Sequence, residues 1–112
     1  PASLSRSKSN LFNAAIDLYW AAIDSAHAAL MASNEIPPSP EHVADMLEKR
    51  LVANKHVSHR YAHIMRQLYA LFKGIIHRDI KEISGKDYDN FKALAEEFVD
   101  GMKDYIERKR KI

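Results

Sequence analysis

The chain contains no cysteine. This absence excludes a disulfide framework, a thiol nucleophile, a cysteine-ligated zinc site and an iron–sulfur cluster. It fits a reducing, intracellular compartment, and we expect a cytoplasmic protein. Glycine and proline are also scarce, with three Gly and four Pro in 112 residues. Their scarcity argues against a β-rich fold and against a glycine-rich loop that cradles phosphates.

Long apolar runs and a large excess of one charge are missing as well. No apolar stretch has the length needed to cross a bilayer, so we expect no membrane partner. The 17 basic and 15 acidic residues leave a net charge of only +2, which gives no general attraction to nucleic acid. Any basic surface must therefore be local.

Helical periodicity is the strongest positive signal in the sequence. Apolar residues recur every three or four positions in four stretches, at about 11–32, 40–52, 57–75 and 91–106. We therefore predict an all-α protein with one helical domain over 11–112. The Ser-rich segment 1–10 has almost no apolar residue to bury, and we predict a flexible tail there.

Local signals place the helix ends. Ser39, followed by a proline, suits a helix N-terminus, and Ser84 and Asp87 have the spacing of a capping box. The second and third stretches are not separated by Pro or Gly. One continuous helix over 40–73 would be about 50 Å long, against roughly 33 Å for the first, so we predict a break between them. Asn54, which tolerates left-handed backbone, is the expected corner.

The first stretch is apolar around an unusually broad arc. Ala14, Leu18, Ala21 and Ala28 lie outside its main stripe, so this helix can pack on more than one side. Burial of the second face would favour association of two chains. We therefore predict a twofold homodimer.

A basic, titratable ridge follows the third stretch, opposite its apolar residues. It consists of His56, His59, Arg60, His63, Arg66, Lys73 and His77. The ridge can be a solvated face, a contact surface for anions or RNA, or a metal site. His59 and His63 can reach one metal, but no carboxylate stands at the spacing that di-iron or zinc-protease helices use. We therefore expect no metal and no cofactor.

Two further clusters have both a structural and a functional interpretation. The cations at 108–111 suit the negative end of a helix dipole and can also bind nucleic acid; we favour the dipole. Asp24 and His27 can orient a catalytic imidazole or form an ordinary exposed pair; we favour the pair. No serine elbow, Walker loop or dinucleotide-binding motif is present.

The order of the predicted elements is also informative. An Ala-rich first helix with the sequence YWAAIDSAHAALMA precedes a Pro-bearing loop, a short second helix, a Tyr/Leu-rich third helix and the linker HRDIKEISGKDYDNF. The Tyr and Ala pattern and the Asp87–Tyr88 pair matter most. Over about residues 9–107 the chain resembles the HEPN family, closest to its small stand-alone prokaryotic members. The resemblance implies an up-and-down four-helix bundle that commonly forms a twofold dimer.

The resemblance also implies a range of functions. Many HEPN proteins are metal-independent ribonucleases, often toxins paired with a small nucleotidyltransferase, whereas others are inactive modules that bind RNA or nucleotides. Active members carry an Arg and, a few residues later, a catalytic His near the junction of the third and last helices. Arg78 stands at that junction, but Ile83, Ser84 and Gly85 occupy the positions where the His would fall.

From these observations we predict a module that binds RNA, a nucleotide or a nucleotidyltransferase partner without a full catalytic site. The candidate phosphate-binding residues are Arg60, His63, Arg66 and Arg78. One alternative is a HEPN ribonuclease, the toxin of a toxin–antitoxin pair, in which His77 beside Arg78 replaces the missing His. A second alternative is a purely structural docking domain.

Overall fold

The computed structural model describes the backbone of residues 2–111 and the side chains of residues 10–111. This part of the chain is all-helical, as predicted. Its α-helices are α1 (Ala2–Ala32), α2 (Val43–Leu47), α3 (His59–Ile76) and α4 (Gly85–Arg110). A 3₁₀ turn, Pro40–His42, leads into α2, and a π-helical turn, Glu48–Val52, extends it. Pro1 of the predicted tail and Ile112 of the predicted domain lie outside the described residues.

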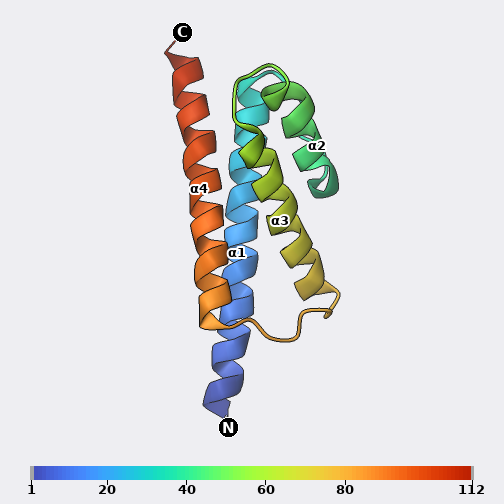
Figure 1. The fold of residues 1–112 in the computed structure, drawn as a ribbon, viewed down its shortest axis with the longest axis vertical. Helices are drawn as coiled ribbons and strands as arrows, with labels where there is room; N and C mark the ends of the chain where they lie inside the picture. The colour runs from blue at the N-terminus through green and yellow to red at the C-terminus, as the bar shows by residue number, and fades with distance from the viewer. Residues whose placement is uncertain (1, 112) are drawn as a thin grey trace.

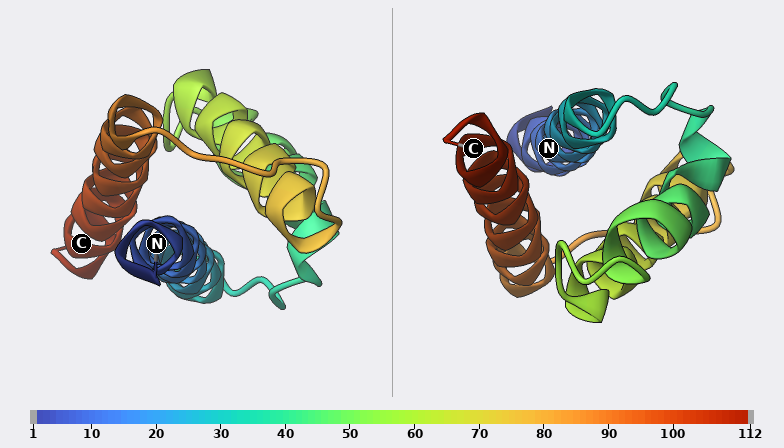
Figure 2. Two further views of the ribbon diagram at one scale, coloured as in Figure 1. Left: turned by 90° about the horizontal axis from the view of Figure 1, so that it is seen from below. Right: turned by 90° about the horizontal axis from the view of Figure 1, so that it is seen from above.

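The helices lie along one another in an elongated bundle of 56 × 24 × 19 Å (Figure 1). Seen along the long axis, α1 lies next to α4, and α2 lies next to α3 (Figure 2). None of the described helices is long and apolar enough to span a membrane.

The directions of the helices differ from the predicted up-and-down order. α1, α2 and α4 run the same way along the bundle, and α3 runs the opposite way (Figure 1). The cause is the segment 33–39, which returns along the bundle before α2 begins. Its residues Pro37 and Pro38 favour extended backbone, and an extended segment of this length spans roughly 23 Å. The C-terminal ends of α1 and α4 therefore meet, and the hydroxyls of Ser33 and Tyr105 share a hydrogen bond there.

Two predicted helix boundaries are wrong by position. α1 begins at Ala2, so residues 2–10 are helical rather than a loose tail. No Pro or Gly interrupts them, and extending an existing helix is far easier than nucleating one. At the corner after α2 the left-handed residue is Lys55, with a φ of 61°, and not Asn54. Asn54 instead donates from Nδ2 to the carbonyl oxygen of Arg50 at 2.7 Å and closes the preceding turn.

The predicted caps are confirmed in part. The Ser84 hydroxyl accepts a hydrogen bond from the Asp87 amide at 3.0 Å and caps α4. Ser39 stands at the start of the 3₁₀ turn, as predicted, but its side chain makes no capping hydrogen bond. Ser58 caps α3 by accepting from the Arg60 amide at 3.2 Å.

The core is built around α1 and the helices that contact it. Tyr19 of α1 is fully buried and stacks on Phe72 of α3, with 4.0 Å between the ring centroids. Small residues allow close approach: a Cβ added at Gly101 of α4 would collide with the ring of Tyr61. The other large, fully buried side chains are Ile23, Leu30, Val43, Leu47, Leu51, Ile64, Met65, Leu68, Phe98 and Met102.

Candidate functional site

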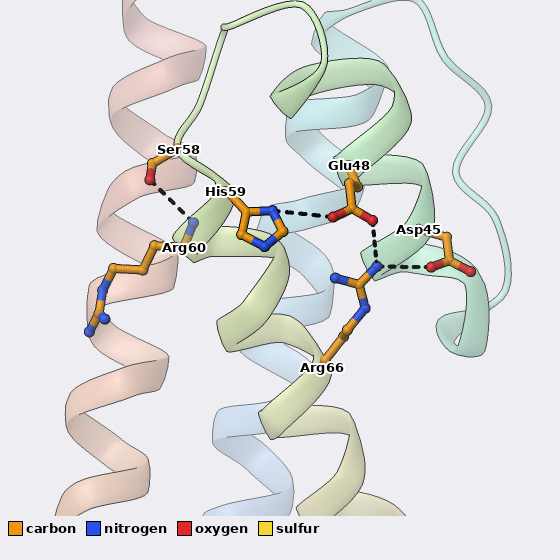
Figure 3. Close-up of polar contacts among 6 residues, drawn as sticks. All are labelled: Asp45, Glu48, Ser58, His59, Arg60 and Arg66. Atoms are coloured by element: carbon orange, nitrogen blue, oxygen red, sulfur yellow. Dashed lines mark hydrogen bonds and ion pairs between the residues drawn. The ribbon is translucent and has the colours of Figure 1, made fainter.

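The arginines of the predicted ridge are engaged with neighbouring helices (Figure 3). Arg66 reaches the α2 segment, where its Nη2 lies 3.0 Å from Asp45 Oδ1 and 2.8 Å from Glu48 Oε2. The hydrogen bond from Arg66, followed by its charge, lowers the pKa of Glu48. The other Glu48 oxygen lies 3.2 Å from Nδ1 of His59. A phosphate could reach Arg66 only in competition with these two carboxylates.

Arg60 is engaged with α4 in the same manner. Its Nη2 donates to Glu97 Oε1 at 2.8 Å, and its Nε donates to the second carboxylate oxygen. This fork-shaped contact lowers the pKa of Glu97, mainly through the hydrogen bonds. His63 is exposed one turn further along α3. The two arginines of the ridge are thus paired with carboxylates of the α2 segment and of α4.

The remaining candidates lie at the opposite end of α3 from Arg60. His77 closes the helix, and Arg78 follows it with a left-handed φ of 61°. Both side chains are exposed, and Arg78 lines a pocket beside the end of α3. The structure therefore does not bring Arg78 together with the arginines of the ridge.

A different set of cations meets at the end of the bundle where α4 finishes. The corner between α2 and α3 and the last turns of α4 line a pocket of about 340 Å³. Its lining residues are Lys55, His56, Tyr105, Arg108 and Lys109. We call it the upper pocket, because the segments that line it, the corner between α2 and α3 and the last turns of α4, lie toward the top of Figure 1.

Backbone hydrogen bonds fix one side of the upper pocket. The amide of Lys55 donates to the carbonyl of Val52 at 2.9 Å, and the amide of His56 donates to the carbonyl of Leu51 at 2.8 Å. Together with the left-handed Lys55, these two bonds form a Schellman motif, in which glycine is the usual left-handed residue. The motif stops the helical segment and holds Lys55 and His56 at the corner.

Side chains of α4 form the other side and tie it to the corner. Arg108 Nη2 donates to the carbonyl oxygen of His56 at 3.4 Å, while its Nε donates to Asp104 Oδ2 at 3.0 Å. The Tyr105 ring lies 5.7 Å from the His56 ring, between centroids, and the Tyr105 hydroxyl bonds Ser33 at the end of α1. Three segments of the chain therefore hold this pocket together.

The cations of the upper pocket are only partly neutralised. Arg108 is paired with Asp104. Among the side chains that the structure describes, Lys55 and Lys109 form no ion pair. The pocket thus presents excess positive charge, which suits an anion with several oxygen atoms.

Sequence reasoning did not find this pocket. It assigned the cations at 108–111 to the helix dipole, and Arg108, Lys109 and Arg110 do occupy the last turn of α4, with Lys111 as its C-cap. Lys55 and His56 lie half a chain away from them, so no local spacing connects the two groups. Only the parallel arrangement of α1 and α4 and the corner after α2 bring them together.

Metal-binding geometry is absent from the described side chains, which contain no group of three or more His, Asp or Glu that could hold a metal ion.

Comparison with known proteins gave no relative: no family model, curated protein or solved structure matches the chain.

Proposed function

We propose that the protein is an RNA-binding helical module of the HEPN kind, and that the upper pocket holds phosphates of the RNA. The observation that carries the proposal is the convergence of Lys55, Arg108 and Lys109, from two distant segments, on one pocket. Arg and Lys side chains supply most contacts to phosphate oxygens in protein–nucleic acid complexes. The HEPN resemblance of the sequence supports RNA as the polyanion.

The size of the pocket limits the affinity. Two or three phosphates can be neutralised by its cations, so the logarithm of the binding constant should fall with the logarithm of salt concentration with a slope of about −1.4 to −2. A protein that bound through its whole surface would show a steeper slope. Binding should therefore be weak at physiological salt and clear at low salt.

Fluorescence anisotropy with a short, labelled single-stranded RNA tests the proposal. In the variant Lys55→Gly/Lys109→Ala, affinity at low salt should fall about ten-fold or more. Glycine suits the left-handed position of the Schellman motif, so this variant keeps the corner intact. The matched control is Lys86→Ala/Lys92→Ala, which removes two exposed lysines from the start of α4 and should leave the affinity within two-fold.

Three outcomes would overturn the proposal. No binding at low salt would exclude the RNA function, and equal losses in the two double variants would reduce it to nonspecific attraction. The same RNA is also incubated with the wild-type protein and its length is followed. Rapid cleavage that is lost in His77→Ala or Arg78→Ala would support the alternative in which the protein is a HEPN ribonuclease.

The proposal includes a twofold dimer formed through α1. Trp20 and Met31 of this helix are 42% and 56% exposed, and the adjacent Ala21 is exposed as well. Burial of these side chains against a second copy would remove apolar surface from water. Sedimentation equilibrium should show a dimer that Trp20→Glu dissociates. A single species of 12.8 kDa at micromolar concentration would contradict the dimer.

A further inference from the structure

The end of the bundle opposite the upper pocket has a cavity of its own. It has a volume of about 460 Å³ and lies between the middle of α1, the end of α3 and the connector that follows α3. Phe12, Ile16, Ile75 and Ile80 form its walls, and Arg78 and Lys81 stand among them. We call it the lower pocket. Its volume is within the range of pockets that bind small ligands.

The apolar wall contributed by the connector is firmly placed. The amides of Asp79 and Ile80 both donate to the carbonyl oxygen of Gly74, at 2.9 and 3.0 Å. The Ile80 side chain packs directly on Gly74, since a Cβ added there would lie 2.5 Å from Ile80 Cδ1. The glycine thus provides the space in which Ile80 sits, and the connector is fastened to the last turn of α3.

The cations of the lower pocket differ from those of the α3 ridge. Arg60 and Arg66 are bound to carboxylates of other helices. Arg78 and Lys81 are exposed, and no ion pair joins either of them to a carboxylate among the described side chains. Arg78 takes the left-handed position of the Schellman motif that ends α3, in which its amide donates to the carbonyl of Ile75 at 3.1 Å and the amide of Asp79 donates to the carbonyl of Gly74 at 2.9 Å.

We propose that the lower pocket binds an amphipathic monoanion, namely an aliphatic chain that ends in a carboxylate. Four apolar side chains offer a surface on which methylene groups lose contact with water. Two unpaired cations at the same pocket offer charge-assisted hydrogen bonds to the carboxylate. A polyphosphate would leave the apolar walls unused, and a neutral alkane would leave the cations unused. The amide of Asn13 also lines the pocket and can bond the second carboxylate oxygen.

Isothermal titration calorimetry of the full chain with hexanoate, octanoate and decanoate, each below its micelle concentration, tests the apolar part. Affinity should rise about ten-fold for each pair of methylene groups added, until the pocket is full. Equal affinity for the three acids would overturn the proposal, because simple charge pairing does not depend on chain length. Absence of heat with decanoate would also overturn it.

The same titration with 1-octanol tests the charged part. Octanol should bind about ten-fold more weakly than octanoate. In the variant Arg78→Gly/Lys81→Ala, the affinity for octanoate should fall to the wild-type affinity for octanol. The affinity for octanol should be the same in the variant and the wild type. Glycine accepts the left-handed backbone at position 78, so the connector keeps its path, and circular dichroism verifies the fold. An octanoate affinity that is unchanged in this variant would overturn the proposal.

Two further arms separate this pocket from other sources of binding. Lys55→Gly/Lys109→Ala, in the upper pocket, should leave the octanoate affinity unchanged, so failure of the RNA proposal and failure of this one are distinguishable. Vesicles of phosphatidylglycerol present the same chemistry on a lipid surface. If the protein sedimented with these vesicles but did not bind free decanoate, the lower pocket would be part of a membrane-binding face and not a site for a free ligand.

Discussion

The two ends of the bundle both present cations, yet the side chains between those cations differ. In the upper pocket, Tyr105 is hydrogen-bonded to Ser33 just after α1, Arg108 is hydrogen-bonded to His56 in the corner between α2 and α3, and the lining residues are cationic or aromatic. In the lower pocket the cations stand among Phe12, Ile16 and other aliphatic side chains. An anion rich in oxygen suits the first environment, and an anion on an alkyl chain suits the second. The sign of the charge alone does not identify a ligand.

Two arginines of α3 make the contrast sharper. Arg60 and Arg66 carry the same charge as Arg78, which follows this helix, but each is bound to carboxylates of a neighbouring segment. These pairs join helices together, whereas the cations at the two ends remain available to a ligand. Pairing with carboxylates of other helices therefore distinguishes Arg60 and Arg66 from the candidate ligand-binding cations.

The largest expected difference between the two ends is in stability. Tyr105 of the upper pocket is 4% exposed and contacts Ser33 after α1 and His56 in the corner before α3, so Tyr105→Ala should destabilise the fold by about 3–5 kcal/mol. Phe12 of the lower pocket is only half-buried, so Phe12→Ala should cost less than half as much. Urea denaturation followed by circular dichroism measures both. Equal costs would show that the lower end is as tightly packed as the upper end.

The next effect is a crossed loss of binding. Lys55→Gly/Lys109→Ala should weaken RNA binding about ten-fold and leave octanoate unchanged, and Arg78→Gly/Lys81→Ala should do the reverse. Both variants remove two positive charges, so general electrostatics changes equally in the two. If either variant weakened both ligands to the same extent, the two pockets would not be separate sites.

Much of the fold could be predicted because its signals are local. Helical periodicity located the helices, and the cap at Ser84 needs only the amide of Asp87, three residues away. The direction of α2 could not be predicted in this way. It depends on whether segment 33–39 turns sharply or returns along the bundle, and only tertiary packing distinguishes these paths.

The candidate sites were less predictable than the helices. Arg60, His63 and Arg66 of the ridge are exposed on α3, whereas His56 and His77 lie just outside this helix. The ion pairs of the two arginines depend on Glu48 and Glu97, which come from different segments. Lys55 takes the left-handed position although Asn54 has the better intrinsic preference, because the helical segment ends one residue later than local propensity indicates. Arg78 was identified at the junction after α3, whereas half of its apolar surroundings, Phe12 and Ile16, come from α1.

The hydrogen bond between Ser33 and Tyr105 should contribute a smaller amount to the stability of the upper end. Tyr105→Phe keeps the ring and removes the hydroxyl, and Ser33→Ala removes its partner. Each change should cost about 1 kcal/mol, and the double variant should cost little more than either single one. Urea midpoints of the four proteins complete the cycle. Fully additive losses would mean that the two hydroxyls stabilise the fold independently of each other.

The smallest expected effect concerns Glu97 and Glu48, the carboxylates that pair with Arg60 and Arg66 of α3. Hydrogen bonds from Arg60 and Arg66 hold the pKa values of Glu97 and Glu48 below the ordinary value of 4.5. A carboxyl whose pKa is lower in the folded chain binds fewer protons when folded, so its stabilising effect is fully present above the unfolded pKa. That effect is lost as the pH falls below 4.5 and through the lowered pKa values of the folded protein.

Urea midpoints measured at a series of pH values on both sides of 4.5 test this for the pair between α3 and α4. Glu97→Gln removes the titrating group and should make the loss of stability in acid less steep. Arg60→Ala removes the cause of the lowered pKa and should reduce the slope in the same interval. Because each variant removes the same contact between Arg60 and Glu97, the double variant should reduce the slope no further than either single variant does. Both side chains of the pair are exposed, so the change in slope should be small. A slope that neither variant alters would show that the contact between Arg60 and Glu97 does not persist in solution, and Arg60 would then be available to a ligand like the cations at the two ends.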